Sequence, residues 1–335
     1  MKTGSQADQR AKSTDDATAQ AVASVFFRLY LLILRLLSKL AMPRAFAVSL
    51  LVNPLLTFPI RHQRRRNFAL LFPDPAHTPQ KRRQLEKDHL KYLAFVRAEM
   101  AHIFLSMKPE DVRQRSSLSG GQHLEAALSK GRGVLIIEGH SGHWNCTPAL
   151  LCALGYPVTA VINPNPLRGA NFRMLHEGAG KALGIKLAFV GQDAYSSAKE
   201  SFRNNQIFYL NFDIAVRTRH TKWFPFGNAA ILADLGPAVM ALRHRVPVLY
   251  AQNTLTERGA EITLTPAADA LSSSMEKPSA EKLMHSWLAQ FQKTVSAQPE
   301  QWWALNYIAL ADKTVLNNPE LREVDETCNA GPNSK

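Results

Sequence analysis

The chain has 335 residues, of which 46% are hydrophobic, and its 40 Lys and Arg against 27 Asp and Glu give a formal net charge of +13. That apolar content excludes a largely disordered chain, and the length predicts one large domain or one domain with a small appendage. A disulfide framework is excluded as well, because Cys146, Cys152 and Cys328 are odd in number and lack metal-ligand spacing, which indicates free thiols.

The N-terminal region divides into a polar tail and an apolar, basic segment. Residues 1–20 are polar and predict a disordered tail, whereas residues 21–60 hold the most apolar runs of the chain and no acidic residue. Helical periodicity over residues 22–40 places Arg28, Arg35 and Lys39 on one face of a Leu-rich helix. Charges are costly inside a membrane span, so the pattern predicts a helix that anchors the chain in a membrane interface. A core helix with one solvated face is the alternative.

A basic run, Arg61-His-Gln-Arg-Arg-Arg66, follows this anchor. We expect Arg64, Arg65 and Arg66 to face anionic lipid headgroups. A nucleic-acid patch is the other interpretation of such a run. The chain carries no recognition-helix motif or aromatic RNA-binding signature, and the neighbouring sequence is lipophilic, so the membrane is favoured.

Residues 61–315 predict an α/β domain, and residues 316–335 a loose tail. A helix is expected over Thr78–Leu105. Short apolar runs typical of strands buried on both faces occupy Val134–Ile137, Val158–Ile162, Ile185–Val190, Ile207–Phe212 and Val246–Ala251. Helical stretches separate several of these runs, which predicts a mostly parallel central sheet flanked by helices.

The segment Glu138-Gly-His-Ser-Gly-His-Trp-Asn145 carries the most chemical information. His140 follows a buried strand and a glycine, so we expect its imidazole at the carboxyl edge of the sheet, where open α/β sheets bind ligands. A helix is expected to begin near His143 and to aim its amide groups at the same crevice. A structural histidine is the alternative to a catalytic one here, at about even odds.

The turn from Gly139 to Asn145 resembles the signature of the lysophospholipid acyltransferase superfamily, and specifically of its lipid A biosynthesis (lauroyl/myristoyl) acyltransferase branch. Members of that branch carry a His, four residues, and then Glu or Asp, with Trp just before the acid. Further segments are similar in the same order along residues 25 to 310: Arg64–Asp74, Asp213 after a strand, Phe224–Ala230 and Pro299–Trp303.

The resemblance implies a membrane-associated acyltransferase with the fold of that superfamily. It would move a fatty acyl group from a thioester of acyl carrier protein or coenzyme A to a hydroxyl or amine of a lipid or glycolipid, by analogy a lipid A precursor. His140 would be the general base, a neighbouring carboxylate would orient it, and backbone amides of the turn or a basic side chain would stabilise the oxyanion. The resemblance implies the cytoplasmic face of a bacterial inner membrane, with acyl carrier protein and membrane lipids as partners and no nucleic acid, metal or other cofactor. Substrate contacts are expected at His143, Trp144, Asp213, Arg217, Arg219, Phe226 and Gly227, and packing or membrane contacts at Trp302 and Trp303.

Asn145 stands where the resembled branch has its acid, and three outcomes are open. Activity is reduced or lost; or the amide oxygen of Asn145 orients the imidazole; or another carboxylate substitutes. Glu138 is the nearest candidate, because residues two apart on a strand face the same side. A non-catalytic scaffold that binds lipid or carrier protein, and a thioesterase, are the competing functions.

Overall fold

The computed structural model describes residues 28–73, 78–163, 169–215, 220–269, 271 and 278–317. Residues 28–37 are helical. The helices that follow are α2 (Met42–Thr57), α3 (Arg61–Leu71), α4 (Pro79–Leu105), α5 (Pro109–Gln114), α6 (Gly121–Leu128), α7 (Cys146–Ala153), α8 (Gly169–Leu183), α9 (Ala194–Arg203), α10 (Gly236–His244) and α11 (Ala280–Ala297). The strands are β1 (Ser116–Ser119), β2 (Val134–Glu138), β3 (Val158–Ile162), β4 (Lys186–Phe189), β5 (Ile207–Asn211), β6 (Thr221–Phe226), β7 (Ala229–Asp234), β8 (Val248–Thr256), β9 (Gly259–Pro266) and β10 (Leu310–Asp312).

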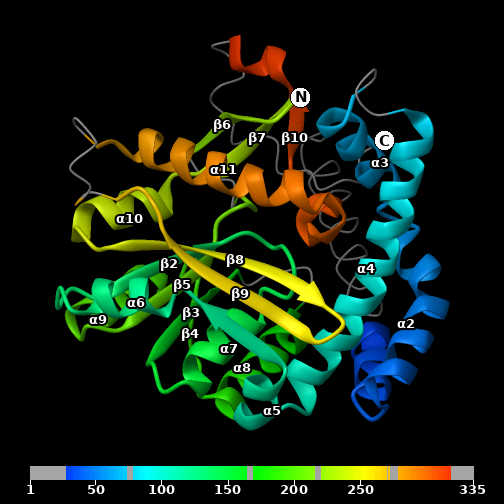
Figure 1. Cartoon of the computed structure of the whole chain (residues 1–335), viewed down its shortest axis with the longest axis horizontal. Coiled ribbons are helices and arrows are strands. Elements are labelled where there is room, and N and C mark those ends of the chain that lie inside the picture. The colour runs from blue at the N-terminus through cyan, green and yellow to red at the C-terminus, as the bar shows by residue number, and fades with distance from the viewer. Residues whose placement is uncertain are drawn as a thin grey trace, which may run out of the picture.

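A seven-stranded, mostly parallel sheet forms the centre of the molecule (Figure 1). Its strand order is β1-β9-β8-β2-β5-β3-β4, and all neighbours are parallel except β8 and β9, which form an antiparallel pair. β2 and β5 lie in the middle of this sheet and are buried along their length. Parallel strands covered on both faces read as continuous apolar runs, which is why their sequences predicted strands.

Two apolar cores lie on the two faces of this sheet. Leu135 and Ile137 of β2 belong to the core that also contains α9, α10 and α11, whereas Val134 and Ile136 belong to the core with α6 and α7. The alternation follows from the two-residue period of a strand. The polypeptide after Ile137 therefore leaves the sheet between two well-packed layers.

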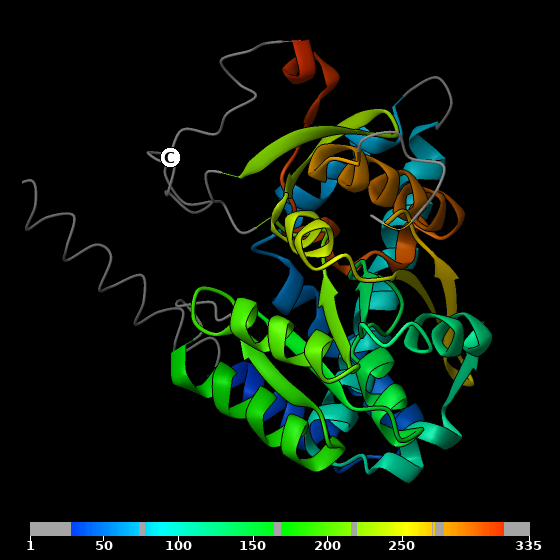
Figure 2. The ribbon, with the colours of Figure 1, turned by 90° about the vertical axis from the view of Figure 1, so that its left-hand side faces the viewer.

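A second, three-stranded sheet of order β10-β7-β6 lies beside α11 (Figures 1 and 2). β6 and β7 form a hairpin, and β10 adds to β7 antiparallel. This sheet shares the core of α10 and α11. Between α11 and β10, the segment Pro299–Trp303 meets the carboxyl edge of the large sheet.

Helix α2 packs along the outer side of α4 (Figure 1), with its polar side chains facing inward and its apolar side chains facing outward. Its buried face is mostly polar: Ser49, Asn53 and Thr57 point inward, and Asn53 bonds both the backbone of α4 and the guanidinium of Arg97. Leu51, which is 82% exposed, lies with Leu55 on the outward side. Helices on the surface of globular proteins usually bury their apolar stripe, whereas α2 turns its apolar residues outward.

No single helix of the described residues has the length and apolar character to cross a membrane. The pair α2 and α3 passes that test only together, and it is bent by 91°. The segment predicted to be an anchor, residues 21–60, contains two helices, residues 28–37 and α2; residues 21–27 lie outside the described residues.

The predicted α/β architecture and mostly parallel sheet are confirmed, and the helix expected at Thr78–Leu105 is α4. All five predicted strands are present, with β3 at the predicted bounds. The hairpin β6–β7, β1, β9 and β10 were not predicted. Cys146 and Cys152 are free thiols, and Cys328 lies outside the described residues.

Candidate active site

His140 and Asp213 lie side by side at the carboxyl edge of the large sheet. β2 and β5 are parallel neighbours whose register pairs Glu138 with Asn211, and each strand continues two residues further to one member of the pair. The two residues therefore meet although 73 positions separate them in the chain, and Nδ1 of His140 lies 2.6 Å from Oδ1 of Asp213.

The Asp213 carboxylate is buried and accepts from three donors. Nδ1 of His140 donates to Oδ1, while Oδ2 accepts from the backbone N–H of His140 at 3.1 Å and from Nε1 of Trp302 at 2.8 Å. With its proton on Nδ1, the neutral imidazole keeps its free lone pair on Nε2. The His140 side chain is 18% exposed and that of Asp213 is 0% exposed. The imidazole of His140 is thus held in one tautomer by a carboxylate that solvent does not reach.

The segment Pro299–Trp303 is joined to the histidine turn through its backbone. Trp302 forms an antiparallel bridge with Ser141, the N–H of Gly142 donates to the oxygen of Gln301 at 3.0 Å, and the N–H of Trp303 donates to the oxygen of His140 at 2.9 Å. Trp302 was expected only to pack in the interior or to contact the membrane. Its contact with Asp213 spans 89 positions, and the sole signal for it was that both residues fall in segments that resemble the family.

His89 of α4 also bonds the segment Pro299–Trp303. Its Nδ1 lies 2.7 Å from the backbone oxygen of Glu300, and Nδ2 of Asn306 lies 3.1 Å from its Nε2. A backbone oxygen only accepts, so Nδ1 is the donor and Nε2 the acceptor. Burial lowers the pKa of His89 to about 4, against a smaller opposing effect of its bond to Glu300. The ring is therefore neutral at pH 7.

Aromatic rings surround the imidazole of His140. The ring centroids of Trp144 and Trp303 lie 5.3 Å and 5.6 Å from that of His140, and the two indoles lie 5.0 Å apart. Tyr307 extends this group, 4.8 Å from Trp303, and is 45% exposed. Trp144, expected to contact substrate, thus stands directly beside the base. These rings provide apolar surroundings in which charge on the imidazole depends on Asp213.

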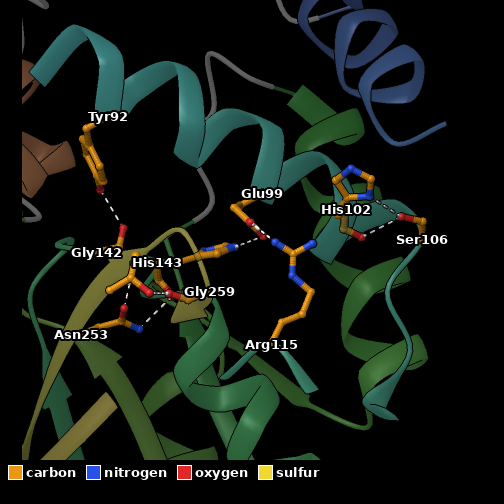
Figure 3. Close-up of polar contacts among 10 residues, drawn as sticks. Tyr92, Glu99, His102, Ser106, Arg115, Gly142, His143, Asn253 and Gly259 are labelled. Atoms are coloured by element: carbon orange, nitrogen blue, oxygen red, sulfur yellow. Dashed lines mark hydrogen bonds and ion pairs between the residues drawn. The ribbon is translucent and has the colours of Figure 1, made fainter. Parts of the chain in front are cut away.

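The backbone of the turn is fixed by two side chains from other elements (Figure 3). The hydroxyl of Tyr92 donates to the oxygen of Gly142 at 2.7 Å, and Asn253 bonds both the N–H and the oxygen of His143. Gly142 has φ +58°, and a Cβ there would lie 2.2 Å from the backbone oxygen of Asn253. The amides of Ser141, Gly142 and His143 all have acceptors, so the expectation that they stabilise an oxyanion is not supported.

His143 points toward the ion pair formed by the buried Glu99 and the partly exposed Arg115 (Figure 3). Its Nε2 lies 4.0 Å from Oε2 of Glu99, and its side chain is 1% exposed. Burial, together with the charge of Arg115, lowers the pKa of His143 to about 3, while burial raises the pKa of Glu99. His143, expected to contact substrate, instead belongs to this interior cluster.

Glu138 does not contact His140. Its Oε2 accepts from the hydroxyl of Tyr209 at 2.8 Å, and the same hydroxyl lies 3.1 Å from the backbone oxygen of Trp144. Burial raises the pKa of Glu138 well above its usual range, which favours the neutral acid. The carboxylate beside the imidazole is that of Asp213, not the predicted Glu138. β2 and β5 are adjacent strands, so the residues that follow them lie closer together than two residues on the same side of one strand.

Asn145 begins α7 and makes no hydrogen bond with His140 or any other described residue. Its Nδ2 is buried without an acceptor in that part of the chain. The interpretation in which the amide oxygen of Asn145 orients the imidazole therefore has no contact in its favour. Asp213 occupies the orienting position instead.

Of the remaining predicted site residues, the structure describes Phe226 and Gly227. Phe226 is buried with its ring 5.3 Å from that of Trp302, so it supports the indole that bonds Asp213. Gly227 lies in the turn of the β6–β7 hairpin with φ +60°. Arg217 and Arg219 fall outside the described residues.

Five of the six cations expected at a membrane are exposed: Arg28, Arg35, Lys39, Arg65 and Arg66. The structure buries the sixth, Arg64, which is 4% exposed and lies 3.2 Å from Glu86. A helix turns once in 3.6 residues, so three consecutive arginines cannot all face the same surface.

The model of one protein family, described as bacterial lipid A biosynthesis acyltransferase, matches residues 18–307. A search of curated proteins found no match to the chain. The family match covers α2 through the Pro299–Trp303 segment, and so includes every residue of the His140 site described above.

Proposed function

Because the chain belongs to the bacterial lipid A biosynthesis acyltransferase family and is thus an acyltransferase, we propose that it transfers a fatty acyl group to a lipid acceptor with His140 as the general base. The donor is a thioester of acyl carrier protein or coenzyme A, and the acceptor presents a hydroxyl or amine. A lipid A precursor is the acceptor that the family suggests first. The observation that carries the assignment of the base is the bond of His140 to the buried Asp213.

In the proposed reaction, Nε2 of His140 removes the proton of the acceptor hydroxyl as its oxygen attacks the thioester carbonyl. The new carbon–oxygen bond forms, the carbon–sulfur bond breaks, and the imidazolium returns its proton to the leaving thiolate. Asp213 holds the reactive tautomer and stabilises the imidazolium, as the acid of a catalytic triad does. The bonds from Trp302 and the His140 backbone keep the carboxylate in position for this role.

We also propose that residues 28–37 and α2 attach the protein to the membrane. Eight large apolar residues between positions 29 and 58 are exposed: Leu29, Leu32, Leu36, Val48, Leu50, Leu51, Leu55 and Phe58. Val48, Leu51, Leu55 and Phe58 follow one another at helical spacing, opposite the polar face that packs on α4. Exposed apolar patches with basic residues around them are typical of membrane-binding surfaces.

The proposed location is the cytoplasmic face of a bacterial inner membrane. A basic protein with a formal charge of +13 complements both anionic lipids and an acidic carrier protein. Attachment through residues 28–37 and α2 would keep the reaction at His140 close to membrane-bound acceptors.

A transfer assay with the purified chain tests this function. Acyl carrier protein that carries a labelled acyl group is incubated with a membrane lipid extract, and lipids that acquire the label identify the acceptor. We expect His140→Ala to abolish labelling and His62→Ala, a change at an exposed histidine of α3, to preserve it. Equal labelling by the wild type and His140→Ala would contradict the role of the base. Labelled free fatty acid without labelled lipid would indicate a thioesterase, and no turnover at all a scaffold.

A further inference from the structure

One peptide group of the histidine turn (Gly139–Asn145), the group between Gly142 and His143, is held at both ends by side chains (Figure 3). Its oxygen accepts from the hydroxyl of Tyr92 at 2.7 Å, and its N–H donates to Oδ1 of Asn253 at 2.9 Å. Tyr92 belongs to α4 and Asn253 to β8, and all four residues are buried. This peptide group therefore connects the turn to a helix and to a strand of the large sheet.

The bonds between the turn and the segment Pro299–Trp303 have backbone partners instead. The N–H of Gly142 donates to the oxygen of Gln301, and the oxygen of His140 accepts from the N–H of Trp303. No side-chain substitution removes either of these partners. The oxygen of Gly142, in contrast, depends on the hydroxyl of Tyr92, which a change from Tyr to Phe deletes while the ring remains.

Helix α4 holds this hydroxyl in a fixed position relative to the site. His89 lies three residues before Tyr92, on the same side of the helix, and bonds the backbone oxygen of Glu300 at 2.7 Å. α4 thus bonds both chain segments of the site, the turn through Tyr92 and Pro299–Trp303 through His89. Supporting bonds from a rigid element are what hold a reactive group in its productive geometry.

Gly142 gives this peptide group the freedom to turn once the bond to Tyr92 is lost. Its φ of +58° lies in the left-handed region that favours glycine, and glycine has access to more backbone conformations than other residues. A buried oxygen without a donor is unfavourable, so the peptide group is expected to rotate toward another donor. That rotation displaces the adjoining residues, among them His140 and Trp144, whose ring centroids lie 5.3 Å apart.

We propose that Tyr92 is a positioning residue for the reaction at His140, and that it acts through the Gly142–His143 peptide group. Its hydroxyl fixes the turn from which Nε2 of His140 reaches the acceptor, and it takes no part in the transfer of the proton or the acyl group. Burial, followed by the charge of Asp213, raises the pKa of Tyr92 well above its ordinary value, so the hydroxyl keeps its proton and stays a donor. The inference rests on the proposed function, in which His140 is the base.

The test compares Tyr92→Phe with Tyr250→Phe in the full chain. Each change removes one buried tyrosine hydroxyl that makes a hydrogen bond of 2.7 Å, and the partner of Tyr250 is Thr294 of α11, outside the site. kcat and KM for the acyl donor are measured below the unfolding temperature of both variants, and thermal unfolding is recorded for each. Tryptophan fluorescence, which needs no activity, reports any movement of Trp144 and Trp303 beside the imidazole.

We expect the two variants to lose similar thermal stability, because each loses one buried hydrogen bond. Tyr92→Phe should lower kcat about tenfold with KM within about twofold, since the base is displaced while the groups that bind the donor remain. It should also change the tryptophan emission, whereas Tyr250→Phe should alter neither kcat nor the emission.

Equal kcat values in the two variants, or a rise in KM alone for Tyr92→Phe, would overturn the inference. Identical tryptophan emission in wild type and Tyr92→Phe would overturn it as well. An inactive wild type would instead contradict the proposed function, and the fluorescence comparison would still test whether the hydroxyl of Tyr92 holds the turn. Failure of the inference is therefore distinguishable from failure of the proposed function.

Discussion

Replacing Asp213 by Asn alters the proton on the base while changing almost no volume. The carboxylate accepts three hydrogen bonds, two of them at Oδ2, from the His140 backbone and from Trp302, and one at Oδ1, from His140 Nδ1. An amide has one oxygen and one NH₂ group, so after this substitution only one of the two positions can still accept hydrogen bonds. Placing NH₂ toward the two donors would leave both unsatisfied, at a cost of about 1–3 kcal/mol each.

The amide oxygen of Asp213→Asn should therefore face Trp302, and its NH₂ should face Nδ1 of His140. The imidazole must then accept at Nδ1 and carry its proton on Nε2, which is the tautomer that cannot accept a proton from the acceptor. The same change in a Ser-His-Asp triad lowers kcat about 10⁴-fold. We expect a loss of about 10³- to 10⁴-fold here, with little change in thermal stability because all three neighbours keep a hydrogen-bond partner.

The assay is the rate of acyl transfer to the lipid acceptor at saturating donor, together with a thermal unfolding curve. Asn145→Ala serves as the control, because Asn145 makes no bond to the imidazole, and it should change the rate less than tenfold. A folded Asp213→Asn protein within about tenfold of the wild-type rate would refute the proposed role of Asp213. A severe loss in Asn145→Ala would return the orienting role to that residue.

Three further results are expected. Glu138→Gln should keep the transfer rate within about threefold, since burial raises the pKa of Glu138 and so favours the neutral acid, which Gln resembles; a loss as severe as that of His140→Ala would show that it acts as a charged group. The contribution of His89 to the free energy of unfolding, measured with urea as the difference between the wild type and His89→Gln, should be fully present above pH 6.5 and fall by up to about 1.4 kcal/mol per pH unit toward pH 4, because the pKa of His89 is about 4 when folded and the unfolded chain binds the proton first. His143, whose pKa is about 3 when folded, adds a dependence of the same sign that His89→Gln leaves in place. An equal slope in the two proteins would contradict the burial argument. Leu51→Ser combined with Leu55→Ser should weaken vesicle binding at least tenfold, because burying each leucine in lipid is worth about 1.5–3 kcal/mol. The free energy of unfolding should change by no more than about 0.5 kcal/mol for each substitution. Unaltered flotation with vesicles would contradict a membrane contact through α2.

The large sheet was predictable from local sequence because its strands are buried on both faces. Val134–Ile137 and Val158–Ile162 contain no polar residue except Thr159, and a run of that length between glycine- or proline-bearing turns has few other conformations. The β6–β7 hairpin was missed for the opposite reason. Its Phe224-Pro-Phe-Gly segment places a proline within a strand, which sequence patterns count against one.

The site was predictable only in part, because its geometry depends on which strands are neighbours. His140 and Asp213 each follow a predicted strand, but β3 and β4 lie between those strands in the chain, and no local pattern states that β2 and β5 pair. The two-residue period of a single strand pointed to Glu138 instead. The burial of Arg64 was likewise set by Glu86 of α4, a partner that charge counting does not reveal.

The bridge between Ser141 and Trp302 sets the order in which the site can be completed during synthesis. Chains fold from the N-terminus as the ribosome extends them, so residues 28–37 and α2 emerge first, then His140, then Asp213. A nascent chain that ends before residue 302 has the base and its carboxylate but neither of the indoles at positions 302 and 303. Helix α2 is thus complete well before the imidazole acquires its final surroundings, and truncated products would carry the helix without the finished site.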